Sequence, residues 1–227
     1  MQHIRAILFD LDNTLIDFTQ MKEEACKTAV RAMIAAGLNM EEKEAYTRLM
    51  ETYFALGLES DSAFTHFLKQ VDQFDHKLLA TAINEYLKAK TNFVKPYPGV
   101  ERVLQELHQK GIVLIILTDA PKTKAYQRLL MMGIEPYFRF IVGFEDTNST
   151  KQTGLPLLRT VDLLKKEVQD IATSEILMVG DSMTRDLAPA KRLGLQTALA
   201  KYGQREKENG VPDYELTSIH DLTKIVS

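Results

Sequence analysis

Two aspartates near the start of the chain, Asp10 and Asp12, directly follow a short apolar run. That run, residues 6–9, has the length and composition of a buried β-strand. Side chains at the carboxyl end of a strand in an open parallel sheet face the crevice where such sheets bind ligands. Two close carboxylates in a crevice repel each other unless a cation or a shared proton relieves the repulsion. The pair therefore indicates a metal site, although aspartate followed by asparagine also occurs in ordinary turns.

A second aspartate pair, Asp181 and Asp186, follows another predicted strand, residues 175–179, which is apolar after its first residue. Gly180 precedes this pair and would let the backbone come close to a neighbouring segment. Asp181 could instead cap the next helix, and Asp186 could simply complement that helix's dipole. Because the carboxyl ends of parallel strands meet at one edge of a sheet, we expect both pairs to gather there. Carboxylates without a nearby His or Cys suit magnesium.

Two more polar residues could complete an anion site. Thr118 follows the apolar run 112–117, and Lys151 lies in a polar loop, residues 146–154, ahead of a predicted helix. A hydroxyl group and an ammonium group can both bind phosphate oxygens. Threonine is also a common turn residue, and a loop lysine is commonly just solvated. The sequence has no P-loop, dinucleotide-binding, nucleophile-elbow or His-Glu-x-x-His motif.

The elements that must position these residues alternate between helix and strand from residue 98 onward. Such alternation predicts an α/β fold with a doubly wound parallel sheet that includes the opening strand. We expect helices at residues 98–110, 122–132, 154–168 and 184–193, and strands at residues 112–117, 138–142, 175–179 and 195–200. A short helix near Gln204, an extended segment at Tyr214 and a last helix from Ser218 complete the predicted elements.

Between the first strand and this region lies a block without a convincing strand. Its apolar residues recur at helical spacing in four segments, which predicts an inserted helical bundle with its aromatic side chains in the core. A turn with two prolines and a glycine, residues 95–99, marks the return from the bundle. We therefore expect a discontinuous α/β core, residues 1–16 and 95–227, and an inserted helical unit, residues 17–94, that acts as a lid.

Composition limits the function classes. The chain has 227 residues and a formal net charge of -3, so it has no basic excess for nucleic acid. Cys26 is the only cysteine, which excludes an intramolecular disulfide and favours a small buried side chain in a reducing compartment. No signal peptide is expected because charged residues interrupt the first apolar run. The longest apolar run is far too short to span a membrane. A cytoplasmic location is expected.

Taken together, these pieces resemble the motifs of the haloacid dehalogenase superfamily of phosphohydrolases. The resemblance covers most of residues 1–16 and 95–205, and the helical insert resembles the α-helical cap of the subfamily I members. Three positions depart from the usual family pattern: Asn13, Asp119 and Gln152 stand where many members have Gly, Asn and Pro. The motifs that carry the resemblance are Asp10-Leu11-Asp12-Asn13-Thr14-Leu15, Thr118, Lys151, and Val179-Gly180-Asp181 with Asp186.

The resemblance implies a reaction and a role for each motif residue. Asp10 would be the nucleophile that forms an aspartyl-phosphate, and Asp12 would be the general acid and then the general base. Thr118 and Lys151 would bind the transferred phosphoryl group. A small phosphorylated metabolite would be the substrate and Mg²⁺ the cofactor. Its expected ligands are Asp10, Asp12 through its backbone carbonyl, Asp181 and Asp186, the last as a direct ligand or through a metal-bound water.

Three alternatives stay open. A metal-independent 2-haloacid dehalogenase of the same superfamily would lack the carboxylate at Asp12. A phosphosugar mutase shares all the motifs and would yield an isomer instead of free phosphate. A non-catalytic phosphate-binding module would release no phosphate at all. The physiological substrate and the oligomeric state do not follow from the sequence.

Overall fold

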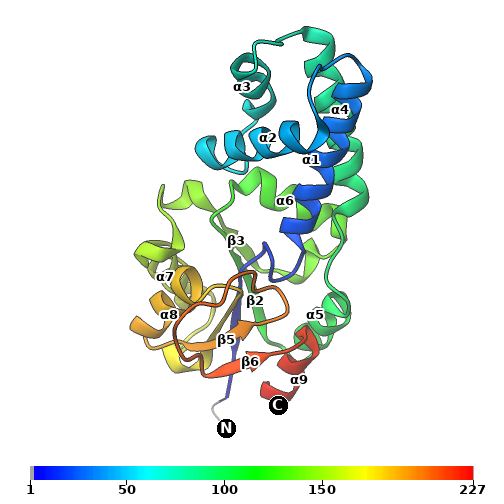
Figure 1. The fold of residues 1–227 in the computed structure, drawn as a ribbon. Helices are drawn as coiled ribbons and strands as arrows, with labels where there is room; N and C mark the ends of the chain where they lie inside the picture. The colour runs from blue at the N-terminus through cyan, green and yellow to red at the C-terminus, as the bar shows by residue number, and fades with distance from the viewer. Residues whose placement is uncertain (1–2, 227) are drawn as a thin grey trace. The chain divides into compact units, whose positions relative to one another are not determined.

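The computed structural model describes residues 3–226, and the chain divides into two compact units. The larger unit combines the residues up to Asp17 with those from Lys95 onward, and the smaller unit is Phe18–Val94. Figure 1 shows the elements of each unit. Among the described residues, none of the helices combines the length and the apolar character needed to cross a bilayer.

The larger unit is built on one parallel sheet of six strands in the order β3-β2-β1-β4-β5-β6. Its central strand β1 pairs Leu8 with Ile115 on one side and with Met178 on the other. The predicted doubly wound sheet is thus confirmed. The strands are β1 (Ala6–Phe9), β2 (Val113–Leu117), β3 (Phe140–Val142), β4 (Ile176–Gly180), β5 (Gln196–Ala200) and β6 (Tyr214–Leu216).

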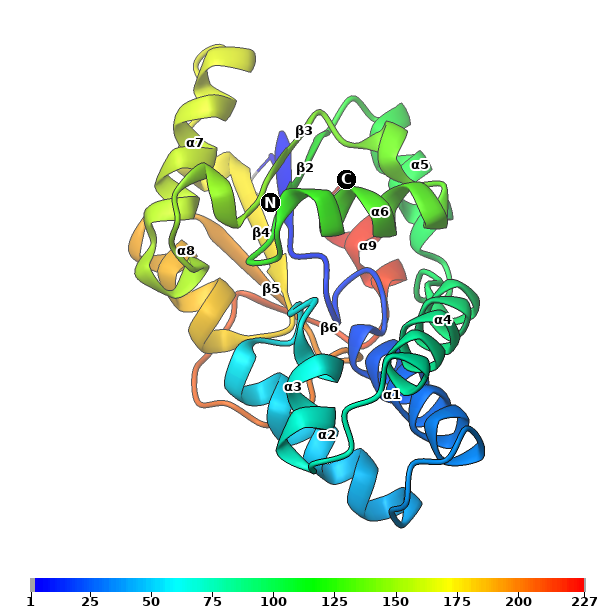
Figure 2. The ribbon, with the colours of Figure 1, turned by 90° about the horizontal axis from the view of Figure 1, so that it is seen from above.

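Helices cover both faces of this sheet (Figure 2). On one face α7 and α8 pack on a cluster that includes Leu8 and Ile115 of the strands and Leu157 of α7. On the other face lie α5, α6 and α9. Burial on both faces explains why the strands read as continuous apolar runs. These helices are α5 (Val100–Gln109), α6 (Lys122–Met132), α7 (Leu155–Glu167), α8 (Ala188–Arg192) and α9 (Leu222–Ile225).

The strand order creates a crevice beside β1. From β1 the chain proceeds to β2 and β3 on one side, and then crosses to β4 and β5 on the other side. Connections that leave neighbouring strands in opposite directions open a crevice at the carboxyl ends of those strands. Asp10 follows β1 and Asp181 follows β4, so the topology alone brings both aspartates to this crevice.

The smaller unit is a helical bundle of α1 (Phe18–Ala35), α2 (Glu42–Leu56), α3 (Ala63–Gln70) and α4 (His76–Phe93). Asp75 caps α4, and its carboxylate accepts hydrogen bonds from the amides of Lys77 and Leu78 at 2.8 and 3.0 Å. Tyr53, Phe64 and Phe67 lie in the core of the bundle, and Tyr46 and Tyr86 pack against it, whereas Phe54 is 70 % exposed. Cys26 is also buried, and burial raises the pKa of its thiol to about 11.

The two chain segments that lead into and out of the bundle lie side by side in the larger unit. Ile16 forms an antiparallel bridge with Pro96, and the amide of Tyr97 donates to the carbonyl of Leu15 at 2.9 Å. Their backbones thus form a short two-stranded connection at the base of the insertion.

One predicted helix is wrong. Residues 201–206, around Gln204, form a turn and an irregular segment instead of a helix. Gly203 explains the difference, because a Cβ built at Gly203 would lie 1.6 Å from the carbonyl oxygen of Asn13. The segment is shaped by its close approach to the loop after β1, which no local pattern in the sequence reveals.

Candidate active site

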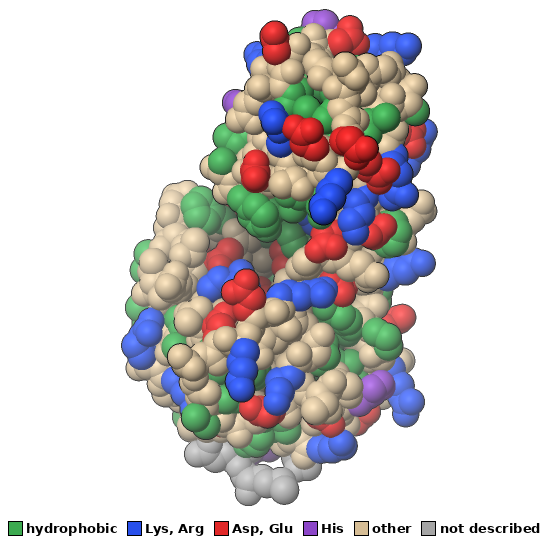
Figure 3. Space-filling view, in the orientation of Figure 1, with side chains coloured by type: hydrophobic (Ala, Val, Ile, Leu, Met, Phe, Trp, Pro, Cys, Tyr) green, Lys and Arg blue, Asp and Glu red, His purple; other side chains and the backbone are tan. Residues whose placement is uncertain are grey.

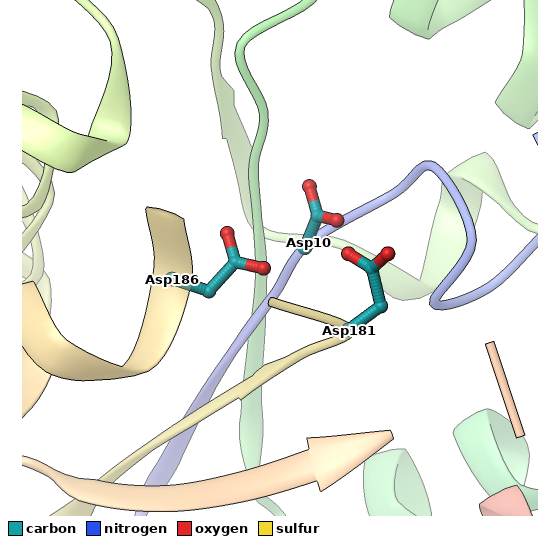
Figure 4. Close-up of side chains that lie close together, drawn as sticks. All are labelled: Asp10, Asp181 and Asp186. Carbon is teal, nitrogen blue, oxygen red and sulfur yellow. The ribbon is translucent and has the colours of Figure 1, made fainter. Parts of the chain in front are cut away.

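Three carboxylates converge at the carboxyl edge of the sheet (Figure 4). Asp10 follows β1, Asp181 follows β4, and Asp186 lies in the π-helical turn Met183–Leu187. Each contributes an oxygen atom within 4.8 Å of the others, and all three side chains are buried. We call these three residues the carboxylate cluster.

Backbone geometry holds Asp186 against β4. Its Oδ2 accepts a hydrogen bond from the amide of Ser182 at 3.1 Å. A Cβ on Gly180 would lie 2.4 Å from that same oxygen, so a side chain at residue 180 would displace Asp186. The Ser182 hydroxyl caps the π-helical turn by accepting from the amide of Arg185 at 3.1 Å. Turns of this kind are rare and occur often at functional sites.

Lys151 is the buried cation that contacts the carboxylate cluster. It lies in the 3₁₀ turn Lys151–Thr153, its side chain is 2 % exposed, and its Nζ donates a hydrogen bond to Asp10 Oδ1. The same Nζ lies 2.6 Å from Asp186 Oδ1. Burial by itself would lower the pKa of this lysine, but the charges of Asp10 and Asp186 raise the pKa above its usual value. Lys151 is therefore a fixed positive charge.

One buried cation does not balance three carboxylates. Burial raises the pKa of Asp10 and of Asp186 above the usual aspartate value, although Lys151 opposes the shift in both. Burial and the charges of Asp10 and Asp186 raise the pKa of Asp181 to about 8, with Arg185 opposing. With all three carboxyl groups ionised, the cluster would carry more negative charge than Lys151 and Arg185 offset.

This excess of buried negative charge fits a divalent cation. The donor set consists of carboxylate oxygens alone, without His or Cys among the clustered residues, and hard cations such as Mg²⁺ prefer such oxygens. A bound cation would lower the pKa of each carboxyl group and so remove the cost of ionising them together. Asp10, Asp181 and Asp186 are the side chains that could hold it.

Thr118 follows β2, the strand next to β1, and its side chain is 3 % exposed. Its hydroxyl accepts a hydrogen bond from the amide of Ala120 at 3.1 Å, which tightens the turn after the strand. Asp119, one of the three departures from the usual pattern, accepts from the backbone amide of Lys151 at 2.7 Å. Asp119 therefore connects the turn after β2 to the loop that supplies the lysine.

The side chain of Asp12 lies outside the carboxylate cluster. Both of its oxygens accept from Arg128 Nη1, at 3.0 and 2.8 Å. Asn13, the next residue, has a φ of 61°, a left-handed conformation that asparagine tolerates better than most side chains. The backbone therefore turns at Asn13 directly after the two aspartates.

Sequence reasoning missed Arg128 and a second set of contacts from residues 202–208. The hydroxyl of Tyr202 donates to the carbonyl of Thr14 at 2.8 Å. Glu208 accepts from the hydroxyl of Ser182 at 2.8 Å and from the amide of Thr184 at 2.6 Å. This segment therefore contacts both the loop after β1 and the loop after β4. Only Arg128 left a signal in the sequence, because helical spacing puts it on the buried face of α6 with Ala125 and Leu129.

Charged side chains outside the site are mixed in sign. On the face shown in Figure 3, basic and acidic side chains are interspersed, in keeping with the formal net charge of -3. Arg139 and Glu167, whose side chains are both exposed, form one pair of opposite charge at 2.6 Å.

The fold and the site define a doubly wound α/β protein with a buried carboxylate cluster at the carboxyl edge of its sheet, and comparison with known proteins gives the family. A sequence profile of the haloacid dehalogenase-like hydrolases matches residues 7–200, and the chain belongs to this family. It is 31% identical to a glyceraldehyde 3-phosphate phosphatase of Methanocaldococcus jannaschii, over 98% of this chain and 97% of the relative. It is 28% identical to a phosphoglycolate phosphatase of Aquifex aeolicus, again over 98% and 97% of the two chains.

A solved structure gives the same fold. The crystal structure of a phosphatase of this family from Thermococcus onnurineus superposes with a TM-score of 0.70 at 24% identity and covers 98% of each chain.

Proposed function

We propose that this enzyme hydrolyses small phosphomonoesters with Mg²⁺ as cofactor and an aspartyl-phosphate on Asp10 as intermediate. The observation that carries the proposal is the buried cluster in which Asp10 contacts Lys151 and lies beside Asp181 and Asp186. The family and the two named phosphatase relatives support the class of reaction. Their names support a short, anionic phosphate ester as substrate.

In the first step Asp10 attacks the phosphorus atom, and the bond between phosphorus and the ester oxygen breaks. Asp12 gives a proton to the departing oxygen, so that an alcohol leaves instead of an alkoxide. In the second step a water molecule attacks the phosphorus atom of the aspartyl-phosphate, and Asp12 takes a proton from that water. Inorganic phosphate leaves, and the Asp10 carboxylate is restored. The proton that Asp12 gives up in the first step is thus replaced in the second, and the phosphoryl group passes from the ester to Asp10 and then to water.

Positive charge around Asp10 makes the first step feasible. Lys151 offers its ammonium group, and Thr118 its hydroxyl, to the oxygens of the transferred phosphoryl group. When bound, Mg²⁺ would supply the charge that lets a carboxylate approach an anionic ester. Its ligands would be the side chains of Asp10, Asp181 and Asp186 and the backbone carbonyl of Asp12.

We also propose that the helical unit is the cap of this enzyme. It is inserted in the chain between β1 and α5, and its two connecting segments pair at Ile16 and Pro96. As a cap it would keep bulk water from the reaction and select the leaving group.

The test is phosphate release from a panel of small phosphomonoesters by the wild type and by Asp10→Asn. The wild type should release phosphate with Mg²⁺, stop when EDTA is added and recover with excess Mg²⁺. Asp10→Asn should be inactive and folded, whereas the exposed Asp170→Asn should behave as the wild type. Full activity in Asp10→Asn would contradict the assignment of Asp10 as the nucleophile. With a 2-haloacid as substrate, halide release that EDTA does not stop would identify a dehalogenase. With a phosphosugar, an isomer in place of free phosphate would identify a mutase.

A further inference from the structure

A buried arginine lies beside the proposed general acid. Arg128 comes from α6 and is separated from Asp12 by 116 residues, yet its Nη1 donates to both carboxylate oxygens of Asp12. The Arg128 side chain is 0% exposed and that of Asp12 is 23% exposed. The contact therefore anchors the carboxylate from the protein interior and leaves part of it accessible.

Stability does not explain this arginine. Arg128 occupies the buried stripe of α6 with Ala125, Leu129 and Met132, where a leucine or methionine would pack without an ionic group to desolvate. Replacing a buried ion pair with apolar side chains of similar size is often neutral or stabilising. A buried guanidinium that reaches a carboxylate at the edge of the site thus points to a role in the reaction.

The charges of the site fall into two groups. Lys151 contacts Asp10 and Asp186, whereas Arg128 contacts Asp12. The side chain of Asp12 does not belong to the carboxylate cluster. Lys151 therefore contacts the proposed nucleophile and a proposed metal ligand, whereas a different cation, Arg128, contacts the proposed general acid.

We propose that Arg128 is a positioning residue that orients the Asp12 carboxyl group for proton transfer to the leaving oxygen and from the attacking water. This inference rests on the proposed function. An arginine suits this role because its guanidinium stays protonated and offers fixed planar N–H donors. It holds the carboxyl group without exchanging protons itself.

The first test compares leaving groups in Arg128→Met, which keeps the length and apolar character of the buried stem. Hydrolysis of an alkyl phosphate, whose leaving group needs a proton, should fall about 100-fold, within the usual range for general acid catalysis. The burst of nitrophenolate from 4-nitrophenyl phosphate should change by less than about threefold, because nitrophenolate leaves without a proton. The steady-state rate after the burst should fall, since Asp12 must still activate water.

Two controls accompany this variant. Arg139→Met removes an exposed arginine that pairs with Glu167 and should leave both substrates unaffected. Arg128→Lys keeps the charge and should restore part of the alkyl phosphate activity. If Arg128→Met does not fold, the same comparison can be made in Arg128→Lys, between its rate on the alkyl phosphate and its nitrophenolate burst.

The second test is a double-mutant cycle with Asp12→Asn. A residue that acts through Asp12 should lose its effect when Asp12 is already changed, so the double variant should equal Asp12→Asn within about threefold. A nitrophenolate burst that falls in Arg128→Met as much as alkyl phosphate hydrolysis does, or additive losses in the cycle, would overturn the positioning role. Absence of phosphate release by the wild type would overturn the proposed function itself, and the inference with it.

Discussion

The carboxylate of Asp119 accepts a hydrogen bond from the backbone amide of Lys151 at 2.7 Å, and this bond joins two loops that approach the site from different strands. Asp119 directly follows Thr118, and the Lys151 side chain reaches Asp10 and Asp186. The aspartate at this position therefore fixes, through its charge and its acceptor oxygen, the start of the turn that supplies the lysine.

Asp119→Ala should therefore weaken catalysis without unfolding the protein. Loss of one hydrogen bond to a charged group costs ~1.5 kcal/mol, which corresponds to a decrease of about tenfold in kcat/KM. Asp119→Asn keeps a carbonyl acceptor and should lose less. Steady-state kinetics on one phosphomonoester, with melting temperatures for all three proteins, checks this. Equal activity of wild type and Asp119→Ala would show that Lys151 is held by other contacts.

Magnesium binding should depend on pH. In the metal-free protein, burial and the neighbouring carboxylates raise the pKa of Asp181 to about 8, so a proton must leave before the metal binds below that pH. The apparent dissociation constant should rise by up to about tenfold per pH unit as the pH falls below this value.

Calorimetric titration with Mg²⁺ at several pH values, in buffers of different ionisation enthalpy, measures both the affinity and the protons released. Asp181→Asn removes the titrating group and should bind Mg²⁺ weakly at every pH. An affinity of the wild type that stays constant from about pH 9 to about pH 6 would contradict the prediction.

Glu208 should support metal binding from outside the carboxylate cluster. Its carboxylate accepts from Ser182 and Thr184, which lie at the start of the turn that bears Asp186. Although burial opposes it, these hydrogen bonds hold the pKa of Glu208 below its usual value. Glu208→Ala should loosen the turn and weaken Mg²⁺ binding about tenfold, as expected for the loss of hydrogen bonds to a charged acceptor.

The matched control for Glu208 is Glu215→Ala. Glu215 pairs with Lys201 on the surface, and its side chain is 53% exposed, so its loss should not affect the metal. Thermal shift with increasing Mg²⁺ compares the two variants with the wild type. If Glu208→Ala and Glu215→Ala respond alike, the contact with Ser182 and Thr184 has no bearing on the cluster.

Gly203→Ala should disturb the loop after β1. The added Cβ would lie 1.6 Å from the carbonyl oxygen of Asn13, so either residue 203 or the loop must move. Overpacking of this kind typically costs 1–3 kcal/mol, on the order of several degrees in melting temperature, and here it should also lower kcat because Asp12 precedes Asn13.

Gly133→Ala is the control that distinguishes a loss of stability from a loss of kcat in Gly203→Ala. Gly133 has a φ of 70° and open space around its Cβ position, so alanine there brings only backbone strain. It should lower the melting temperature and leave kcat unchanged. A Gly203→Ala variant with wild-type kcat would show that the loop absorbs the added methyl group without moving Asp12.

Local patterns were enough to predict the doubly wound sheet and the meeting of its strand ends. Strands buried on both faces are continuous apolar runs, and parallel strands deliver whatever follows them to one edge. The runs before Asp10 and Asp181 therefore predict that these residues lie near each other, and the structure places them in one cluster. Such reasoning depends on periodicity and on chain direction, and both can be determined from residues that are close together in the sequence.

The partners of the site residues depended on tertiary structure. Arg128 contacts Asp12 across 116 residues, Asp119 contacts the amide of Lys151, and Glu208 contacts the loop after β4. The misassigned helix at Gln204 has the same cause, because the shape of that segment is set by the approach of Gly203 to Asn13. Each of these contacts follows from how loops and helices pack in three dimensions, and packing between distant segments leaves no period or spacing in the chain.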